Sequence, residues 1–146
     1  MHRQTILAIA ALVFLPLSSC TSISVQPINR SANLKHICIH ENVMVVDDSL
    51  LTALKAGFNR HHISTQVFTG NPPIGCEYIL TYTALWSIDF ATYLSDAEIG
   101  IKHKGNIIAS AKYRLRGDGG GLSLMKWQDT KTKIDPVIDA LLRAYP

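Results

Sequence analysis

The order of apolar and polar residues along the chain predicts five strands. The two kinds of residue alternate, as in a strand with one buried face, in segments 36–40, 64–68, 77–88, 92–102 and 107–116. The alternation is longest in 77–88, where one face carries Tyr78, Leu80, Tyr82, Ala84, Trp86 and Ile88. In the next two strands the buried faces are expected to carry Tyr93, Ala97, Ile99 and Ile101, and then Ala109, Ala111, Tyr113 and Leu115.

Two other segments repeat their apolar residues at helical spacing. Asp47 or Asp48 can cap the first, whose apolar stripe consists of Leu50, Leu51, Leu54 and Phe58. Gly57 weakens this helix without abolishing it. The second is expected to begin with Asp135 as its cap and Pro136 at its first position, with Ile138, Leu141, Leu142 and Tyr145 on its stripe. The sequence therefore predicts a single α+β domain of order β-α-β-β-β-β-α, with a mostly antiparallel sheet and helices packed on one face.

The register of the last two strands follows from packing and charge together. A three-residue turn, Lys104-Gly105-Asn106, sets Ile101 opposite Ala109, Ile99 opposite Ala111 and Ala97 opposite Tyr113. It also sets Glu98 opposite Lys112 and Asp96 opposite Arg114. A two-residue turn would pair Ala97 with Lys112 and mix the faces, so the longer turn is expected, with Asn106 in the left-handed conformation.

The first residues predict that the chain is exported and lipidated. His2 and Arg3 precede an apolar run, residues 6–17, that is too short to span a membrane, and the run ends in Leu17-Ser18-Ser19-Cys20. This is the lipobox pattern of bacterial lipoproteins, in which the signal peptide, here residues 1–19, is removed and Cys20 receives acyl chains such as palmitate. The alternative is an ordinary secreted protein with a cysteine after its cleavage site. The non-acidic Thr21 favours the periplasmic face of the outer membrane of a Gram-negative bacterium.

The rest of the chain divides into a tether and one domain. Residues 20–33 are rich in Ser, Asn, Gln and Pro and are expected to form the lipidated N-terminus and a flexible tether, and residues 34–146 the globular periplasmic domain. The formal net charge is +3, and removal of Arg3 with the signal leaves about +2, which indicates no nucleic-acid partner. The late basic residues Lys126, Lys131 and Lys133 are assigned to a solvated surface.

Cys38 and Cys76 are expected to form a disulfide, because an exported chain folds in an oxidising compartment. Two unpaired buried thiols are the alternative. A metal site is less favoured, since no histidine stands at a recognised ligand spacing from either cysteine.

The sequence offers no recognisable catalytic constellation. The glycine-rich run at 117–121 resembles a phosphate-binding loop but follows a hairpin strand and lacks the Lys-Ser/Thr that such loops carry. His61 and His62 lie near a helix end, where cations are favoured, and point about 100° apart, which makes them a poor chelate. Neither a Gly-x-Ser-x-Gly motif nor a Cys-His nucleophile pair is present. We therefore expect no enzyme activity, no cofactor and no metal.

The segment that contains Trp86, Asp89 and Tyr93 is the most distinctive cluster. One interpretation makes the two rings core aromatics around a corner that Asp89 shapes. The other makes the three residues an exposed contact patch for a partner.

Segments 76–93, 119–127 and 133–136 carry a resemblance to a known family. With the sequences Leu80-Thr81-Tyr82-Thr83-Ala84, Trp86-Ser87-Ile88-Asp89 and Lys133-Ile134-Asp135-Pro136, the chain resembles a family of small proteobacterial lipoproteins of unknown function. The lipobox and the two cysteines fit this family, which implies no activity and no catalytic residue. The order of elements also resembles auxiliary lipoproteins of lipid-transport systems.

The sequence thus favours a non-enzymatic binding or scaffolding module of the cell envelope, held by its lipid, with a periplasmic protein, lipid or glycan as partner. The late hairpin could present an edge to a partner strand. The alternatives are an auxiliary lipoprotein of an envelope transport system, and a small hydrolase or ligand-binding domain with a site around Asp89, Tyr93 and the glycine run.

Overall fold

The computed structural model describes residues 21–116 and 124–145. The expected signal peptide, Cys20 and the glycine run lie outside these residues.

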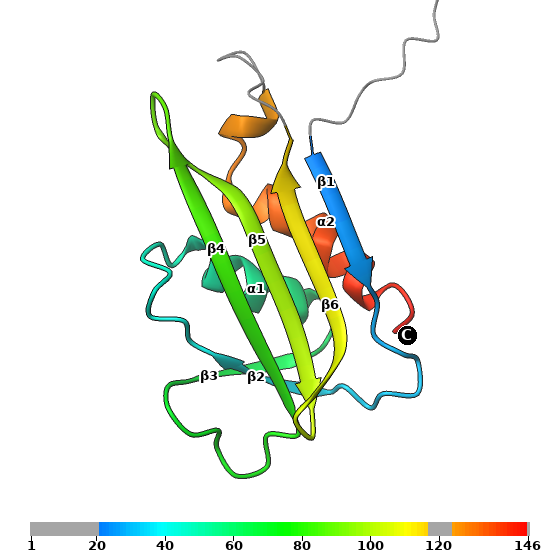
Figure 1. Cartoon of the computed structure of the whole chain (residues 1–146). Coiled ribbons are helices and arrows are strands. Elements are labelled where there is room, and N and C mark those ends of the chain that lie inside the picture. Colours follow the sequence, from blue (N-terminus) through cyan, green and yellow to red (C-terminus); the bar gives the residue numbers. More distant parts are fainter. Residues whose placement is uncertain (1–20, 117–123, 146) are drawn as a thin grey trace, which may run out of the picture.

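The described chain forms one domain with a six-stranded mixed sheet and two helices (Figure 1). The elements are β1 (Thr21–Gln26), β2 (His36–His40), α1 (Ser49–Arg60), β3 (Ser64–Phe68), β4 (Tyr78–Ile88), β5 (Thr92–His103), β6 (Asn106–Leu115), the 3-10 helix η1 (Leu124–Trp127) and α2 (Thr130–Leu142). The sheet order is β1-β6-β5-β4-β2-β3. The pairs β1–β6, β6–β5 and β5–β4 are antiparallel, whereas β2 is parallel to both β4 and β3. Both helices lie on the same side of the sheet.

Strand β1 corrects the expected tether. All six of its residues pair with β6, from Thr21 opposite Leu115 to Gln26 opposite Ser110. Ile28, which follows, is fully buried, and its N–H donates to the carbonyl of Leu141 at 3.0 Å. The element order is therefore β-β-α-β-β-β-β-α, and the edge that the late hairpin was expected to offer is occupied by β1.

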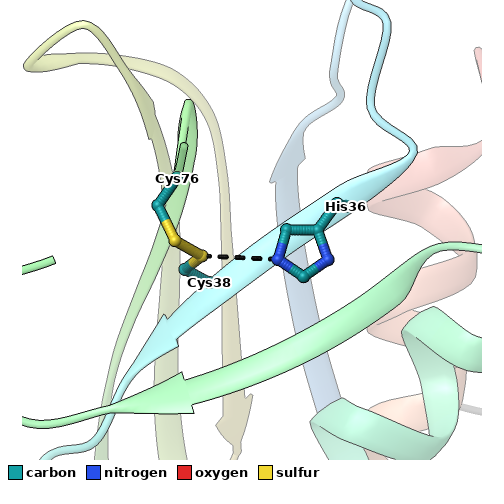
Figure 2. A group of neighbouring side chains, drawn as sticks. All are labelled: His36, Cys38 and Cys76. Carbon is teal, nitrogen blue, oxygen red and sulfur yellow. Dashed lines mark hydrogen bonds between the residues drawn. A yellow bond between two sulfur atoms is a disulfide. The ribbon is translucent and has the colours of Figure 1, made fainter. Parts of the chain in front are cut away.

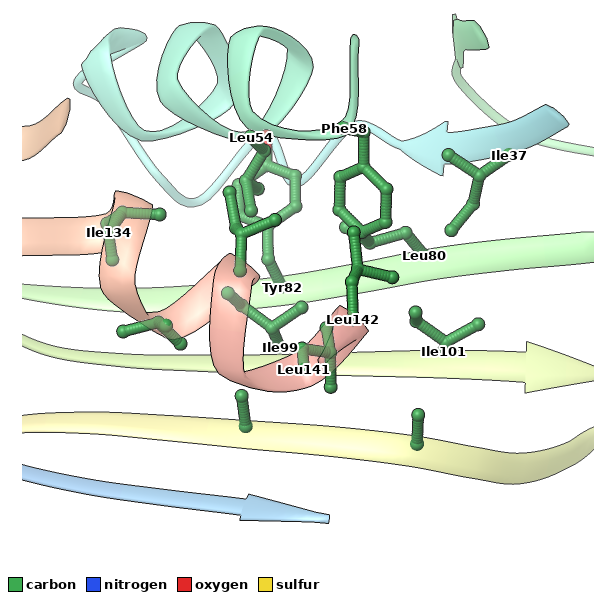
Figure 3. Close-up of a cluster of buried hydrophobic side chains, with 14 of the residues drawn as sticks. Ile37, Leu54, Phe58, Leu80, Tyr82, Ile99, Ile101, Ile134, Leu141 and Leu142 are labelled. Carbon is green, nitrogen blue, oxygen red and sulfur yellow. The ribbon is translucent and has the colours of Figure 1, made fainter. Parts of the chain in front are cut away.

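The core lies between the two helices and one face of the sheet. Figure 3 shows Leu54 and Phe58 of α1 and Leu141 of α2 directed toward the sheet. On β4 the alternating pattern predicts the buried residues Tyr78, Leu80 and Tyr82 correctly. It fails at the end of the strand, where Ile88 is exposed.

A bulge in β5 changes which residues face the core near its start. Leu85 pairs with Asp96 but Trp86 pairs with Leu94, so Ser95 is an extra residue without a partner of its own. The extra residue reverses the alternation. Leu94 is consequently buried in the position that was expected for Tyr93.

The register of the β5–β6 hairpin is confirmed, but its turn is not. All five expected pairs are present, and Arg114 Nε lies 2.7 Å from a carboxylate oxygen of Asp96. The turn nevertheless has two residues, Lys104 (φ 50°) and Gly105 (φ 82°), and closes on a pair between His103 and Asn106. Asn106 is therefore not the left-handed residue. A bulge at Ile108 shifts the strands by one position and restores the register that the core requires.

The capping of α1 agrees in part with the expectation. Asp48 occupies the N-cap position, but its side chain makes no capping hydrogen bond. The carboxylate of Asp47 instead accepts the N–H of Ser49 at 2.7 Å.

Helix α2 begins earlier than expected. Asp129 is its N-cap and accepts the N–H of Thr132 at 2.7 Å, so the helix starts at Thr130. Asp135 is not a cap, and Pro136 lies inside the helix, where it costs one backbone hydrogen bond. The expected stripe is buried at Ile138, Leu141 and Leu142, while Tyr145 packs against the core from a partly exposed position.

Candidate functional site

One end of the sheet brings together the start of β1 and the turn between β4 and β5. Ser22, Arg114, Asp96 and Leu85 are paired side by side across β1, β6, β5 and β4. Beyond this row lie Thr21, residues 86–93 and η1 (Figure 1). We call the group formed by Thr21, residues 85–93 and η1 the entry end, because the first described residue of the domain lies there.

The β4–β5 turn is the part of the entry end that extends furthest along the strands. Leu85 and Ser22 belong to the same row of paired residues. Ile88 lies three residues beyond this row, whereas Thr21 lies only one residue beyond it. At a rise of about 3.3 Å per residue, the turn therefore extends roughly 7 Å further than Thr21.

The turn carries large apolar side chains that nothing in the described chain covers. Ile88 is 81% exposed and Phe90 is 89% exposed, and Leu85 on the adjoining part of β4 is 66% exposed. The N–H of Asp89 donates to the carbonyl of Ala91 at 3.2 Å, which holds the turn closed. Exposed apolar residues that gather in this way commonly mark a contact with a partner or a membrane.

Behind the turn, aromatic and charged side chains pack together. The rings of Tyr93 and Trp127 meet edge to face with centroids 5.9 Å apart. The Lys126 ammonium lies 4.7 Å from the centre of the Tyr93 ring and 5.3 Å from that of Trp127, and it forms an ion pair with Asp89. The hydrogen bond to Asp89 raises the pKa of Lys126 above its usual value. The charges of Asp89 and Lys126 are thus engaged with each other.

Lys133 fixes η1 and α2 to the start of β5. Its side chain is buried, which corrects the expected solvated position, and Nζ donates to the carbonyls of Lys126 at 2.9 Å and Leu94 at 3.2 Å. Burial lowers its pKa. The two hydrogen bonds of this lysine thus connect α2 with η1 and with the start of β5.

The three residues singled out from the sequence have different positions. Asp89 and Tyr93 both contact Lys126. Trp86 packs against the core instead, with a buried Nε1 that has no hydrogen-bond partner in the described chain. Sequence reasoning missed Phe90, Lys126 and Trp127 as members of this site. The only local signal was the end of the alternating pattern at Ile88.

A disulfide joins β2 to the loop before β4, as expected (Figure 2). Cys38 and Cys76 are bonded, with Cα atoms 5.9 Å apart. His36 Nε2 lies 3.6 Å from the Cys38 sulfur, and its Nδ1 lies 2.8 Å from the Ser64 hydroxyl. The shared face of residues two apart in a strand could have predicted this closeness. Because both sulfurs belong to the disulfide, the group does not offer three metal ligands in this state.

The face of the sheet opposite the helices holds a shallow hollow of about 570 Å³. Its lining includes Thr81, Thr83, Glu98, Gly100, Ser110 and Lys112. Lys112 and Glu98 form an ion pair across β6 and β5, which fits the expected role of these charges in setting the register. The hollow is open, and it lies on the strands rather than at the entry end.

Within residues 21–116 and 124–145, no helix is both long enough and apolar enough to span a membrane. No protein-family model matches the chain, and no curated protein matches it. Among solved structures, the chain is similar to the PelC dodecamer from Paraburkholderia phytofirmans, with a TM-score of 0.58 and 12% identity over 82% of this chain and 98% of that one. A point variant of that dodecamer gives a TM-score of 0.53 and 11% identity over 80% and 96% of the two chains. At such identities the similarity establishes a shared fold.

Proposed function

We propose that the protein is a lipid-anchored binding module on the periplasmic face of the bacterial outer membrane. It works as one subunit of an assembly of its own copies. The observation that carries this proposal is the position of Thr21. It is the first residue of a strand that pairs along its whole length with β6, and it directly follows Cys20 of the lipobox. An acyl chain on Cys20 would thus attach to an edge of the folded sheet without a tether.

Self-assembly is supported by the fold and by the sheet edges. The similar PelC chains are dodecamers, and they match over nearly their whole length. The sheet described here ends in β1 on one side and β3 on the other, two different strands. When two different surfaces of identical subunits contact each other, the copies form a closed ring if the rotation from one copy to the next brings the last copy back to the first. Two different sheet edges suit contacts of this kind.

The anchor and the assembly can be tested on one preparation. The full chain is expressed with its signal, extracted from envelopes in mild detergent and analysed by intact and native mass spectrometry. We expect a mature chain that begins at Cys20 and carries acyl groups, in a homo-oligomer larger than a dimer. The control Cys20→Ala should lose the acyl mass and leave the membrane fraction. A chain without acyl groups would overturn the anchor, and an acylated monomer would overturn the assembly.

A further inference from the structure

We infer that the β4–β5 turn inserts into the surface of the same bilayer that holds the lipid anchor, as a second and non-covalent membrane contact. The inference rests on the proposed anchor at Cys20 and goes beyond it, because it fixes the orientation of the domain. It also assigns a role to Ile88 and Phe90, which make no contribution to the buried core.

Geometry supports the insertion. Cys20 directly precedes Thr21, so the Cα atom of the acylated residue lies about 3.8 Å from that of the first residue of β1. Thr21 pairs with Leu115 at the start of β1, so the attachment follows directly on the edge of the sheet. The turn reaches roughly 7 Å further than Thr21 in the same direction. Apolar groups at a membrane surface penetrate about 5–10 Å into the boundary between headgroups and acyl chains, which matches this reach.

The chemistry of the entry end fits a membrane surface. Ile88 and Phe90 at the tip are apolar and exposed. The carboxylate of Asp89 between them is paired with Lys126, and the rings of Tyr93 and Trp127 pack around that lysine. Tyrosine and tryptophan favour the headgroup level of a bilayer. Arg116, exposed just after β6, adds a positive charge at the same end. An exposed apolar tip next to aromatic rings is the arrangement expected of a segment that enters a membrane surface.

The opposite end of the domain supplies a matched control. Ile74 is 107% exposed in the loop before β4, whose first residue pairs with His103 near the β5–β6 turn. It is thus as apolar and as exposed as Ile88 but lies at the far end of the sheet from Thr21. If exposed apolar residues entered the membrane without regard to the anchor, both ends would do so.

The test places a spin label on the lipidated protein in vesicles of phosphatidylethanolamine and phosphatidylglycerol. Because Cys38 and Cys76 are bonded and Cys20 is acylated, Ala91→Cys at the turn and Ile74→Cys at the far end each provide a single reactive thiol. We expect the label at 91 to gain accessibility to oxygen and lose accessibility to a water-soluble nickel chelate when the protein enters vesicles. The label at 74 should keep the accessibility that it has in detergent-free solution.

A second variant tests which side chains cause the insertion. Ile88→Ser with Phe90→Ser removes apolar groups that are already exposed, so the fold should persist. The label at 91 should then return to the aqueous values of the label at 74, while the acyl mass on Cys20 stays unchanged.

Each outcome bears on one idea only. An acylated protein whose label at 91 remains aqueous would overturn the insertion and leave the anchor standing, whereas loss of the acyl mass would overturn the anchor. A label at 91 that is already shielded in Cys20→Ala protein without vesicles would show that the turn contacts a partner or another copy, and would also overturn the insertion.

Discussion

Gly57 of α1 faces Ile138 of α2 so closely that a Cβ on the glycine would lie 2.2 Å from Cδ1 of the isoleucine. Both residues are buried, and the two helices pack against each other at this point. The glycine that weakens the helix is therefore the residue that lets α1 and α2 approach.

We expect Gly57→Ala to destabilise the protein, although alanine favours a helix by about 1 kcal/mol. The added methyl group must displace a buried side chain or separate the helices, and such overpacking costs about 1–3 kcal/mol. Urea unfolding measures the difference. Ile138→Val removes the clashing Cδ1, so the double variant should be more stable than the sum of the single changes predicts. Strictly additive effects would show that the contact is not responsible.

The disulfide between Cys38 and Cys76 should contribute to stability through the unfolded chain. It closes a loop of 38 residues, and the chain-entropy relation gives about 4 kcal/mol for a loop of this length. We expect Cys38→Ala with Cys76→Ala to lower the free energy of unfolding by an amount of this order. Dithiothreitol should have a comparable effect on the parent protein and none on the double variant. A similar unfolding curve for parent and variant would contradict the prediction.

The stability of the protein should fall at acidic pH because of an ion-pair cluster between α1 and α2. Arg60 contacts Asp135 at 2.9 Å and also pairs with Asp139, which accepts a hydrogen bond from His61 at 2.7 Å. Burial alone would raise the pKa of each carboxyl group, but Lys131 and Arg60 lower that of Asp135, and His61 and Arg60 lower that of Asp139. Groups with lowered folded pKa values contribute stability above their unfolded pKa of about 3.9 and lose it as the pH falls through the folded value.

Unfolding curves between neutral pH and about pH 3 test this cluster. Arg60→Gln should reduce the loss of stability at acidic pH, because both pKa values move back toward those of the unfolded chain. Lys55→Gln removes the same charge from an exposed position on the same helix and serves as the control. An equal effect of the two substitutions would assign the pH dependence to net charge rather than to the ion pairs.

The parts of the fold that the sequence predicts are those in which local pattern and tertiary packing agree. In the β5–β6 hairpin the apolar alternation and the pairs Glu98–Lys112 and Asp96–Arg114 select the same register, and the structure has it. Strand β1 was missed because Ile23 and Val25 are its only large apolar residues, and it is held by hydrogen bonds to β6 rather than by its own pattern. The start of α2 was misplaced because Asp135-Pro136 imitates a helix start, whereas Asp129 supplies the cap.

The candidate site was predicted only where its residues are neighbours in sequence. Asp89 and Tyr93 stand four residues apart, and both belong to the entry end. Lys126 reaches Asp89 from 37 residues away, through the position of η1 and its hydrogen bond to Lys133. No pattern within one segment reports such a contact. The bulge at Ser95, which sends Tyr93 toward Trp127 and Leu94 into the core, is equally a property of the paired strands.

Mutations in the turn between β5 and β6 can distinguish the two-residue turn of the structure from the three-residue turn that the sequence predicts. In the structure Lys104 has a positive φ of 50°, which costs an ordinary residue about 1 kcal/mol or more, whereas asparagine tolerates it. Asparagine followed by glycine is also the preferred pair for a two-residue turn of this hand. We therefore expect Lys104→Asn to stabilise the protein by about 0.5–1 kcal/mol in urea unfolding. Asn106→Ala should change little, since Asn106 is a paired strand residue. A three-residue turn with Asn106 in the left-handed conformation would give the opposite ranking, because alanine would then be strained at 106 and the change at 104 would bring no gain.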